Sequence, residues 1–352
     1  MELNELSSLT NHLREKSDLD RNHVRTAIDL LIQEDGDANT KADFLVALAE
    51  KGESQQEITH FVSCFRELAR DPGLEDFAPR AIDLCGTGGD KAGSFNVSTF
   101  VSFVIASAGI PVIKHGNRSI SSKCGSADLL EAIGIPLDPE LSRIKEGLKE
   151  LDFAFLFAPS FHPAFKHIAP VRKELASRGI ITIFNRLGPM INPAQPAFQV
   201  LGVYDPRYIE KMGQALKGNG LTGALIAHGK IQGSETSGVD ELTACGKNLV
   251  FGFGEISTDQ VESWSPEKWG MPTHPFEHLE GGDLERNLEI MKGLLDGEGP
   301  VGLRATIAMN ASVAFQTCGK TKSLEEGLEL TQTLISEGKV KEWVDKASSF
   351  FA

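Results

Sequence analysis

The hydrophobic pattern of the chain changes near residue 71, and this change limits the possible folds more than any other feature. Before it, apolar residues recur at helical spacing in the runs 2–16, 23–34, 44–49 and 58–68. After Asp71-Pro72-Gly73, which is typical of a chain break, strand-like runs (81–85, 111–113, 153–157, 224–228) alternate with helical runs (98–108, 127–133), and residues 283–350 are mostly helical. This order predicts an α/β fold: a small N-terminal α-helical domain (1–75) plus a larger α/β domain (76–352), whose central mixed sheet is flanked by helices.

Local signals refine these elements. Thr40 with Asp43, and Ser54 with Glu57, fit the capping pattern in which a hydroxyl residue is followed three positions later by a carboxylate. Gly52 stands where the third helix should end in a left-handed residue. Residues 258–282, rich in Pro, Gly and Trp, are expected to form an irregular surface excursion.

Charge and cysteine usage exclude several classes of function. The 352 residues contain 49 acidic and 35 basic side chains, a net charge of −14, which argues against nucleic acid or an anionic membrane as partner. The first residues mix charges with leucines, unlike a secretory signal, and no apolar run approaches the roughly 18 residues that a membrane span needs. Five scattered cysteines without a CxxC pair argue against a disulfide framework and predict a cytoplasmic protein.

A glycine-rich loop follows the first predicted strand. The segment Gly86-Thr87-Gly88-Gly89-Asp90 leads within a few residues to a helix that starts near Asn96. Glycines let backbone N–H groups face a ligand, and a helix amino terminus adds unpaired donors, so the pattern predicts a phosphate or pyrophosphate site. It matches neither the dinucleotide fingerprint nor the Walker loop. A tight strand-to-helix turn without a ligand is the alternative.

A basic loop follows the second predicted strand. The segment 114–119 reads Lys-His-Gly-Asn-Arg-Ser, and Ser121, Ser122, Lys123 and Ser126 come soon after. Such side chains form charge-assisted hydrogen bonds with phosphate oxygens. In open α/β sheets ligands bind at the carboxyl ends of strands, so two successive loops of this kind favour one anion site over a merely solvated basic loop.

Together these motifs resemble the anthranilate phosphoribosyltransferase family, whose fold is related to that of the nucleoside phosphorylases. Further matches are His-Pro-Ala at 162–164, Val-Arg-Lys-Glu-Leu at 171–175, Leu-Gly-Pro at 187–189 and Asp-Glu at 240–241. The resemblance implies transfer of a phosphoribosyl group from phosphoribosyl pyrophosphate (PRPP) to anthranilate, giving N-(5-phosphoribosyl)anthranilate and pyrophosphate in tryptophan biosynthesis. It also implies Mg²⁺, a homodimer formed through the helical domain, and a return segment near 163–192 that joins this domain.

The resemblance also assigns roles to residues. PRPP would be bound by Gly86, Gly89, Asp90, Ser94, Asn96, Val97, Ser98, Thr99, Lys114, His115, Gly116, Asn117, Arg118, Ser119, Ser121, Ser122 and Ser126. Anthranilate would be bound by Gly86, Asn117, His162, Arg172 and Pro189, with Arg172 opposite the carboxylate. Magnesium would be held by Ser98, Asp240 and Glu241.

The chemistry agrees with this assignment. The main problem is charge on the leaving pyrophosphate, which oxygen-bound magnesium and backbone donors neutralise. An aromatic amine is neutral near pH 7, so no general acid or base is assigned, and His115 is as readily a structural histidine. Arg186 and an insertion at 176–179 flank the predicted acceptor pocket and leave a different acceptor as an alternative, and the long 229–239 loop leads into the acidic pair. A nucleoside phosphorylase and a non-enzymatic binding protein are kept as competing hypotheses.

Overall fold

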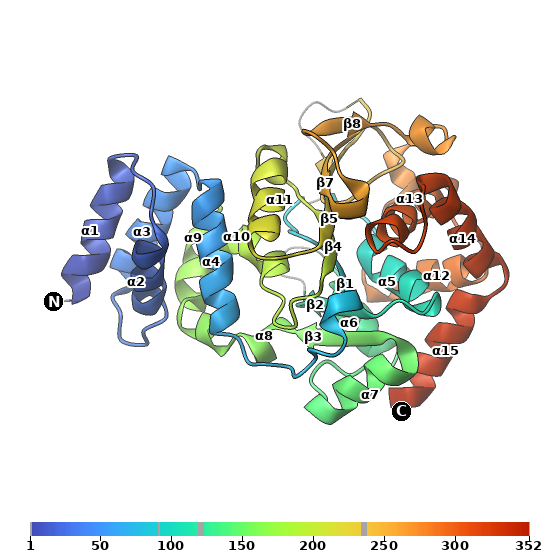
Figure 1. The fold of residues 1–352 in the computed structure, drawn as a ribbon, viewed down its shortest axis with the longest axis horizontal. Helices are drawn as coiled ribbons and strands as arrows, with labels where there is room; N and C mark the ends of the chain where they lie inside the picture. The colour runs from blue at the N-terminus through green and yellow to red at the C-terminus, as the bar shows by residue number, and fades with distance from the viewer. Residues whose placement is uncertain (1, 91, 119–122, 234–237, 352) are drawn as a thin grey trace.

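The computed structural model describes residues 2–90, 92–118, 123–233 and 238–351. A group of amino-terminal helices lies at one end of the molecule, beside a sheet that helices flank (Figure 1). These amino-terminal helices are α1 (Glu2–Arg14), α2 (Arg21–Leu31), α3 (Ala38–Lys51) and α4 (Gln55–Glu67). The helical start of the chain is therefore confirmed. Within the described ranges, no helix combines the length and apolar character needed to cross a membrane.

The caps of these helices test the local signals. The capping box of α4 is confirmed: Glu57 N donates to Ser54 Oγ (3.3 Å), and Ser54 N donates to Glu57 Oε2 (2.8 Å). Gly52 follows α3 with φ of +83°, as predicted. The prediction for Thr40 is wrong, because α3 begins at Ala38 and Thr40 N donates to the Asp37 carboxylate (2.8 Å). Aspartate is a better amino-terminal cap than threonine, so the earlier residue takes the position.

The predicted mixed sheet is present. Its strands are β1 (Ile82–Gly86), β2 (Val112–Gly116), β3 (Phe153–Phe157), β4 (Phe198–Gly202), β5 (Gly223–Lys230), β6 (Gly238–Val239), β7 (Asn248–Phe253) and β8 (Glu262–Trp264). Their order is β3-β2-β1-β4-β5-β7-β8, with β6 paired to β5. The strands from β3 to β5 run parallel, whereas β6, β7 and β8 pair antiparallel. The carboxyl ends of β1, β2 and β4 therefore meet at one edge of the sheet.

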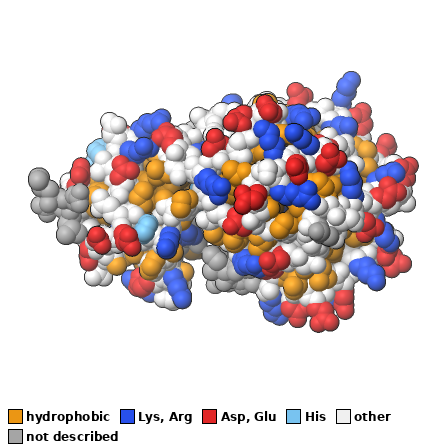
Figure 2. Space-filling model, turned by 90° about the horizontal axis from the view of Figure 1, so that it is seen from below, with side chains coloured by type: hydrophobic (Ala, Val, Ile, Leu, Met, Phe, Trp, Pro, Cys, Tyr) orange, Lys and Arg blue, Asp and Glu red, His pale blue; other side chains and the backbone are white. Residues whose placement is uncertain are grey.

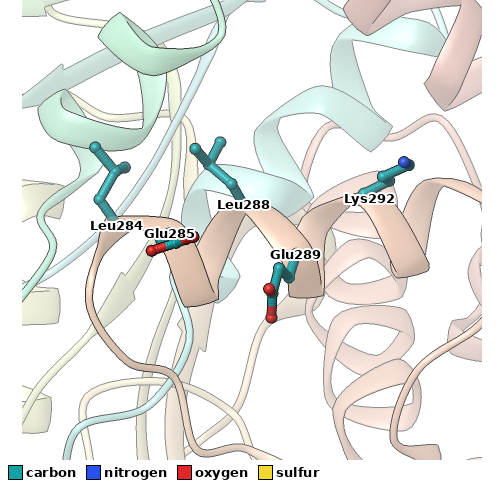
Figure 3. Close-up of a pocket in the computed structure, with 5 residues that line it drawn as sticks. All are labelled: Leu284, Glu285, Leu288, Glu289 and Lys292. Atoms are coloured by element: carbon teal, nitrogen blue, oxygen red, sulfur yellow. The ribbon is translucent and has the colours of Figure 1, made fainter.

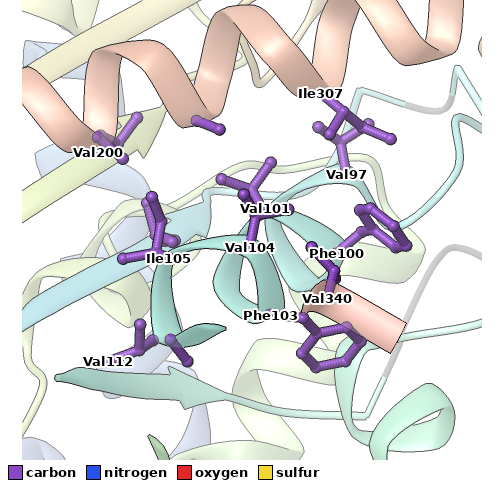
Figure 4. Close-up of a cluster of buried hydrophobic side chains, with 14 of the residues drawn as sticks. Val97, Phe100, Val101, Phe103, Val104, Ile105, Val112, Val200, Ile307 and Val340 are labelled. Atoms are coloured by element: carbon purple, nitrogen blue, oxygen red, sulfur yellow. The ribbon is translucent and has the colours of Figure 1, made fainter. Parts of the chain in front are cut away.

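Helices fill the connections and cover the sheet. They are α5 (Val97–Ser107), α6 (Ser126–Ala132), α7 (Leu141–Leu151), α8 (Ala158–Phe161), α9 (Ala169–Ser177), α10 (Phe184–Leu187), α11 (Ile209–Gly218), α12 (Leu284–Leu295), α13 (Val301–Thr317), α14 (Leu324–Ser336) and α15 (Lys339–Phe351). Short 3-10 turns are η1 (Ala78–Arg80), η2 (Pro163–His167), η3 (Gly188–Met190), η4 (Pro206–Tyr208), η5 (Gly254–Ile256), η6 (Pro266–Trp269) and η7 (Phe276–His278). Helix α5 lies in the core, where Phe100, Val101 and Val104 pack near Ile307 of α13 and Val340 of α15 (Figure 4). This burial fixes the amino end of α5 beside the sheet edge.

The amino-terminal helices share a buried cluster with a later part of the chain. Val171 and Leu175 of α9, and Phe184 and Leu187 of α10, lie in the same cluster as Phe61 of α4. The cluster also reaches α11 and residues of β4, β5 and β7, so it does not separate the chain at residue 75. The domain boundary and the return segment stay predictions.

The segment 258–282 differs from expectation. Trp264 and Trp269 are buried, at 6% and 4% exposure, and their rings lie 5.8 Å apart. The interpretation of this segment as a surface excursion is therefore wrong for both tryptophans. Their large rings are buried in the fold, and no local sequence pattern predicts that burial.

Acidic and basic side chains are interspersed over the surface. The face shown in Figure 2 carries both kinds, with hydrophobic side chains between them. The net charge of −14 is thus not visible there as one continuous acidic area.

Candidate active site

The glycine loop leaves the end of β1 and folds back over the acidic pair. Gly88 and Gly89 have φ of +69° and +90°, a region that glycine adopts without strain. Gly88 N donates to Asp240 Oδ2 at 2.6 Å, and Ala92 N donates to Asp90 Oδ1 at 3.0 Å. The loop and the acidic pair, 152 residues apart in the sequence, therefore form one site.

The last residues of β1 and β4 must be small to admit Asp240. A Cβ on Gly86 would collide with the Asp240 carboxylate, and a Cβ on Gly202 would collide with the Asp240 backbone. Glycine at both strand ends lets this chain segment cross the edge of the sheet in direct contact with it.

Asp240 and Glu241 are buried carboxylates in an unfavourable environment. Burial raises the pKa of Asp240 to about 8, and the neighbouring Asp90 carboxylate contributes to the shift. Burial, together with the charges of Asp240 and Asp90, raises the pKa of Glu241 well above its usual range. Glu241 Oε1 is buried and has no hydrogen-bond partner among the described residues. A cation would relieve this arrangement.

The predicted metal ligands line one small cavity. Ser98, Asp240 and Glu241 border a cavity of about 20 Å³, together with Leu84, Gly202 and other residues. Within the described part of the chain, no group of three or more His, Cys, Asp or Glu side chains is placed to hold a metal by itself. Two carboxylates and a hydroxyl suit Mg²⁺, which usually takes few protein ligands and completes its shell with water and substrate phosphate. The residues present therefore fit magnesium.

The amino end of α5 adjoins this cavity. Val97 and Thr99 are each 1% exposed, and Thr99 Oγ1 is buried without a partner in the described residues. The side chain of Asn96, the residue before the helix, accepts no hydrogen bond from the first turn. Of the residues predicted to bind PRPP in this segment, Val97 can thus offer only its backbone.

The basic loop after β2 is less open than its sequence indicates. The Lys114 side chain is buried, and its Nζ donates to Leu84 O and lies 3.4 Å from Ser98 Oγ. Arg118 forms exposed ion pairs with Asp128 and Glu131, both at 2.8 Å. Both cations therefore already have partners within the protein.

Three of the serines predicted for this loop lie outside the described residues. They are Ser119, Ser121 and Ser122. Of the other loop residues, Asn117 Oδ1 accepts from Arg118 N (2.8 Å), and Ser126 Oγ donates to Asn117 O (3.5 Å). Ser126 thus lies against the same loop, and its role in PRPP binding stays a prediction. Ser94, at the far side of the glycine loop, forms an isolated bridge with Glu280.

A buried polar group beneath the two loops has no counterpart in the sequence predictions. Asp83 of β1 is fully buried and accepts from Asn192 Nδ2 (2.9 Å) and His115 N (3.3 Å). Burial raises the pKa of Asp83 to about 6, although the Lys114 ammonium opposes the shift. A charged residue inside an otherwise apolar strand was the available signal, because such residues are rarely buried without partners.

Two of the residues predicted for the acceptor, His162 and Pro189, lie close to His115, which is predicted to bind PRPP. The rings of His115 and His162 lie 5.0 Å apart, and His115 Nδ1 lies 3.1 Å from the carbonyl oxygen of Gly188, next to Pro189. Burial lowers the pKa of His115 to about 3 and that of His162 to about 4, so both rings are neutral at pH 7. Each has a buried Nε2 without a partner among the described residues.

Arg172 is an uncompensated cation. Its guanidinium lies 5.8 Å from the ring centre of Phe165 and 5.2 Å from that of Phe184. Phe165 in turn contacts the His162 ring (5.6 Å). No acidic side chain pairs with Arg172 within the described ranges, and burial lowers its pKa. A planar cation held over aromatic rings without a counter-ion suits a carboxylate ligand.

Arg186 is the residue whose presence beside the predicted acceptor pocket left a different acceptor as an alternative. Its side chain contacts Glu53 and Tyr208 instead. Its Nη1 lies 3.1 Å from Glu53 Oε1, and its guanidinium stacks 3.9 Å from the Tyr208 ring centre. The inserted residues extend α9 to Ser177 and then turn at Gly179, with φ of +73°. Of the long 229–239 loop, residues 234–237 lie outside the described part.

A larger hollow of about 540 Å³ contains none of the predicted site residues. It runs along one side of α12, where Leu284 and Leu288 project in the same direction (Figure 3). Glu285, Glu289 and Lys292 complete its lining. Its lining is aliphatic with charges of both signs. It lacks the group of polar side chains that meet at the carboxyl ends of the strands.

Comparisons with known proteins agree with this geometry. The sequence matches the helical bundle domain of a glycosyl transferase family over residues 7–69 and the a/b domain of that family over residues 78–341. The anthranilate phosphoribosyltransferase of Petrotoga mobilis is 38% identical over 333 residues, which cover 94% of this chain and 93% of that protein. The crystal structure of anthranilate phosphoribosyltransferase from Thermus thermophilus matches with a TM-score of 0.85 at 36% identity, covering 97% of this chain and 99% of that chain. The enzyme of the same name from Saccharomyces cerevisiae, in complex with PRPP and Mg, shares the fold (TM-score 0.81, 23% identity, 98% and 97% covered).

Proposed function

We infer that this chain, which belongs to the anthranilate phosphoribosyltransferase family, transfers the phosphoribosyl group of PRPP to anthranilate, giving N-(5-phosphoribosyl)anthranilate and pyrophosphate in tryptophan biosynthesis. The observation that carries this function is the hydrogen bond from Gly88 N to Asp240 Oδ2, because it joins the loop that we propose binds phosphate to a buried acidic pair. An acidic pair beside an anion cradle makes chemical sense only with a cation between them.

The donor half of the reaction depends on neutralising pyrophosphate. As the bond from C1 of the ribose to pyrophosphate breaks, negative charge accumulates on the leaving group. In the first turn of α5, Ser98 N has no acceptor among the described residues and would donate a hydrogen bond to a phosphate oxygen. Asp240 and Glu241, with Ser98 beside them, would hold Mg²⁺, which when bound neutralises charge on the pyrophosphate oxygens. The other residues proposed to bind PRPP are those named in the sequence analysis, from Gly86 to Ser126.

The acceptor half depends on orientation. Arg172 would bind the anthranilate carboxylate, while the neutral rings of His115 and His162 and the segment at Pro189 would enclose the aromatic ring. The amine forms a bond to C1 and loses a proton to solvent, so no side chain must first remove one. Catalysis then rests on positioning and electrostatics. The ion pair of Arg186 with Glu53 supports anthranilate over an altered acceptor, because it holds the guanidinium on another contact.

The proposal also covers the cellular location and the oligomeric state of the enzyme. A cytoplasmic location is supported by the five cysteines, which form no disulfide in the described part of the chain. A homodimer through the helical domain, which the family resemblance implies, belongs to the same proposal. Light scattering of the purified protein measures its mass: twice the chain mass supports the dimer, and a monomer refutes it.

A panel of acceptors tests the function. Pyrophosphate release from PRPP and Mg²⁺ is measured with 2-, 3- and 4-aminobenzoate and with aniline. The proposal predicts that 2-aminobenzoate, which is anthranilate, has the highest kcat/KM, because only it places the amine and the Arg172-bound carboxylate in the required relation. A higher kcat/KM for another amine would support the alternative acceptor, and metal-independent phosphorolysis of nucleosides would support a phosphorylase.

A further inference from the structure

Helix α5 begins at a residue that ought to cap it but does not. Asparagine is among the preferred amino-terminal caps because its side-chain oxygen accepts from the N–H of the second or third helical residue. Asn96 precedes the helix with φ of −70° and ψ of 63°, and its side chain makes no such bond. Its backbone carbonyl accepts from Thr99 N and Phe100 N. Among the described residues, Ser98 N has no acceptor.

The Asn96 amide is used in a cross-link between distant segments. Its Nδ2 donates to Cys124 O (3.1 Å), in the segment that follows the basic loop. Its Oδ1 accepts from Asn287 Nδ2 (3.0 Å), 191 residues away on α12. One side chain thus joins the start of α5, the segment that follows the basic loop, and α12.

The orientation of both amides is fixed by backbone groups at the two ends of this chain of hydrogen bonds. Cys124 O can only accept, so the Asn96 atom facing it is the nitrogen. Gly282 N can only donate, and it donates to Asn287 Oδ1 (2.8 Å), which leaves Asn287 Nδ2 for Asn96. Turning over either amide would place like groups in contact.

Asn287 itself is tightly held. It is 2% exposed and lies in the first turn of α12, where its N–H donates to Asp283 O (3.0 Å). The preceding strap, residues 279–282, is bonded to the segment between the glycine loop and α5: Phe95 N donates to Leu279 O (2.8 Å), and Gly281 N donates to Gly93 O (2.9 Å). A Cβ on Gly281 would lie only 2.9 Å from Asn287 Oδ1 and 3.0 Å from Phe95 Cα. Only glycine therefore leaves room for the strap at this position.

We propose that Asn287 is a positioning residue for the PRPP site. By donating to Asn96 Oδ1, it keeps the Asn96 side chain from capping α5, so the Ser98 N–H stays available to a phosphate oxygen. Through Asn96, it also holds the start of α5 against Cys124 O, in the segment that follows the basic loop. This inference rests on the proposed donor site but not on the identity of the acceptor.

Replacement by aspartate tests the donor role with little change of shape. In N287D the new carboxylate still accepts from Gly282 N, but it has no proton to give to Asn96 Oδ1. The Asn96 amide must then turn or swing, which breaks the bond to Cys124 O and lets its oxygen cap α5. N287A removes both bonds and serves as a second variant. N219A is the matched control, because Asn219 cross-links the end of α11 to Thr59 O (3.2 Å) and touches no predicted site residue.

The experiment measures two quantities for each folded variant. Calorimetry gives the Kd of inorganic pyrophosphate with Mg²⁺, and steady-state kinetics give kcat and the KM of each substrate. For N287D we expect pyrophosphate Kd and PRPP KM to rise about tenfold, the size of one lost charge-assisted hydrogen bond. We expect kcat and the KM of anthranilate to stay within about twofold, and N219A to resemble the wild type.

Each other outcome is decisive. Pyrophosphate affinity within twofold of the wild type in N287D overturns the proposal, as does an equal rise in the KM of both substrates, which a merely structural role would produce. If the wild type binds pyrophosphate but does not use anthranilate, the proposed function fails while the Kd comparison still tests Asn287. If the wild type binds no pyrophosphate, both fail. A crystal structure of N287D should show the Asn96 oxygen within hydrogen-bond distance of Ser98 N or Thr99 N.

Discussion

Replacing Arg186 of α10 tests whether this residue joins the amino-terminal helices to α10 and η4 rather than selecting the acceptor. In R186L, Glu53 loses a partner at 3.1 Å while its side chain stays fully buried, and Arg186 is itself only 12% exposed. Removing one member of a buried ion pair costs roughly 3–5 kcal/mol, because the remaining charge is uncompensated. The Tyr208 hydroxyl still donates to Glu53 Oε2 (2.5 Å), which places the cost at the lower end. Loss of the guanidinium stacked on Tyr208 adds about 1 kcal/mol.

We therefore expect R186L to lower the free energy of unfolding by about 3–4 kcal/mol, measured by urea denaturation followed by tryptophan fluorescence. The double variant R186L/E53Q should regain about 1–2 kcal/mol of this loss, because glutamine leaves no buried charge. R178L is the control: Arg178 pairs with Glu174 on the surface of α9, with both side chains more than half exposed, so its loss should cost less than about 1 kcal/mol. Anthranilate KM of folded R186L should stay within about threefold of the wild type. A loss of stability under about 1 kcal/mol, or a tenfold rise in anthranilate KM at unchanged stability, would refute the reasoning.

Three further outcomes are expected. R172A should raise the KM of anthranilate about 10- to 100-fold and that of PRPP less than about twofold, since a charge-assisted contact to the carboxylate is lost; equal rises would remove Arg172 from the acceptor side. D240N should raise the Mg²⁺ concentration for half-maximal rate at least about tenfold, in a magnesium titration at saturating substrates, and an unchanged titration would exclude Asp240 as a ligand. His162 takes up a proton near pH 6.5 when unfolded but only near pH 4 when folded, because burial lowers its pKa, so stability falls as pH drops from 6.5 toward 4. At pH 5 this amounts to about 2 kcal/mol, and H162Q should show a shallower loss between pH 7 and 5; an identical slope would contradict the assignment.

Local chemistry in the sequence predicted the parts of the fold that neighbouring residues determine. The capping box at Ser54 and Glu57, and strand β3 at residues 153–157, are set by short-range preferences and were confirmed. Strands β4 and β7 went unpredicted, because their assignment depends on partners elsewhere in the sheet: β4 lies between β1 and β5. Thr40 shows the limit even within one turn, since Asp37 and Thr40 both offered a side chain that could cap the start of the same helix.

In the site, too, local motifs could be predicted from the sequence, whereas contacts between distant residues could not. The glycine loop, the basic loop and the acidic pair could each be found as a motif, and the structure brings them to one edge of the sheet. What the sequence could not show is how long-range contacts use those residues. Lys114 is directed to Leu84 O, and Asn96 is held by Asn287, because burial leaves each polar group with only the partners that the fold places beside it.

The central claim is tested most directly by the fluorescence of anthranilate during incubation with the protein, PRPP and Mg²⁺. We predict a continuous loss of that fluorescence, with one pyrophosphate released for each anthranilate consumed and no loss when either PRPP or Mg²⁺ is omitted. Unchanged fluorescence with folded protein, while pyrophosphate is released in the presence of another amine, would contradict it.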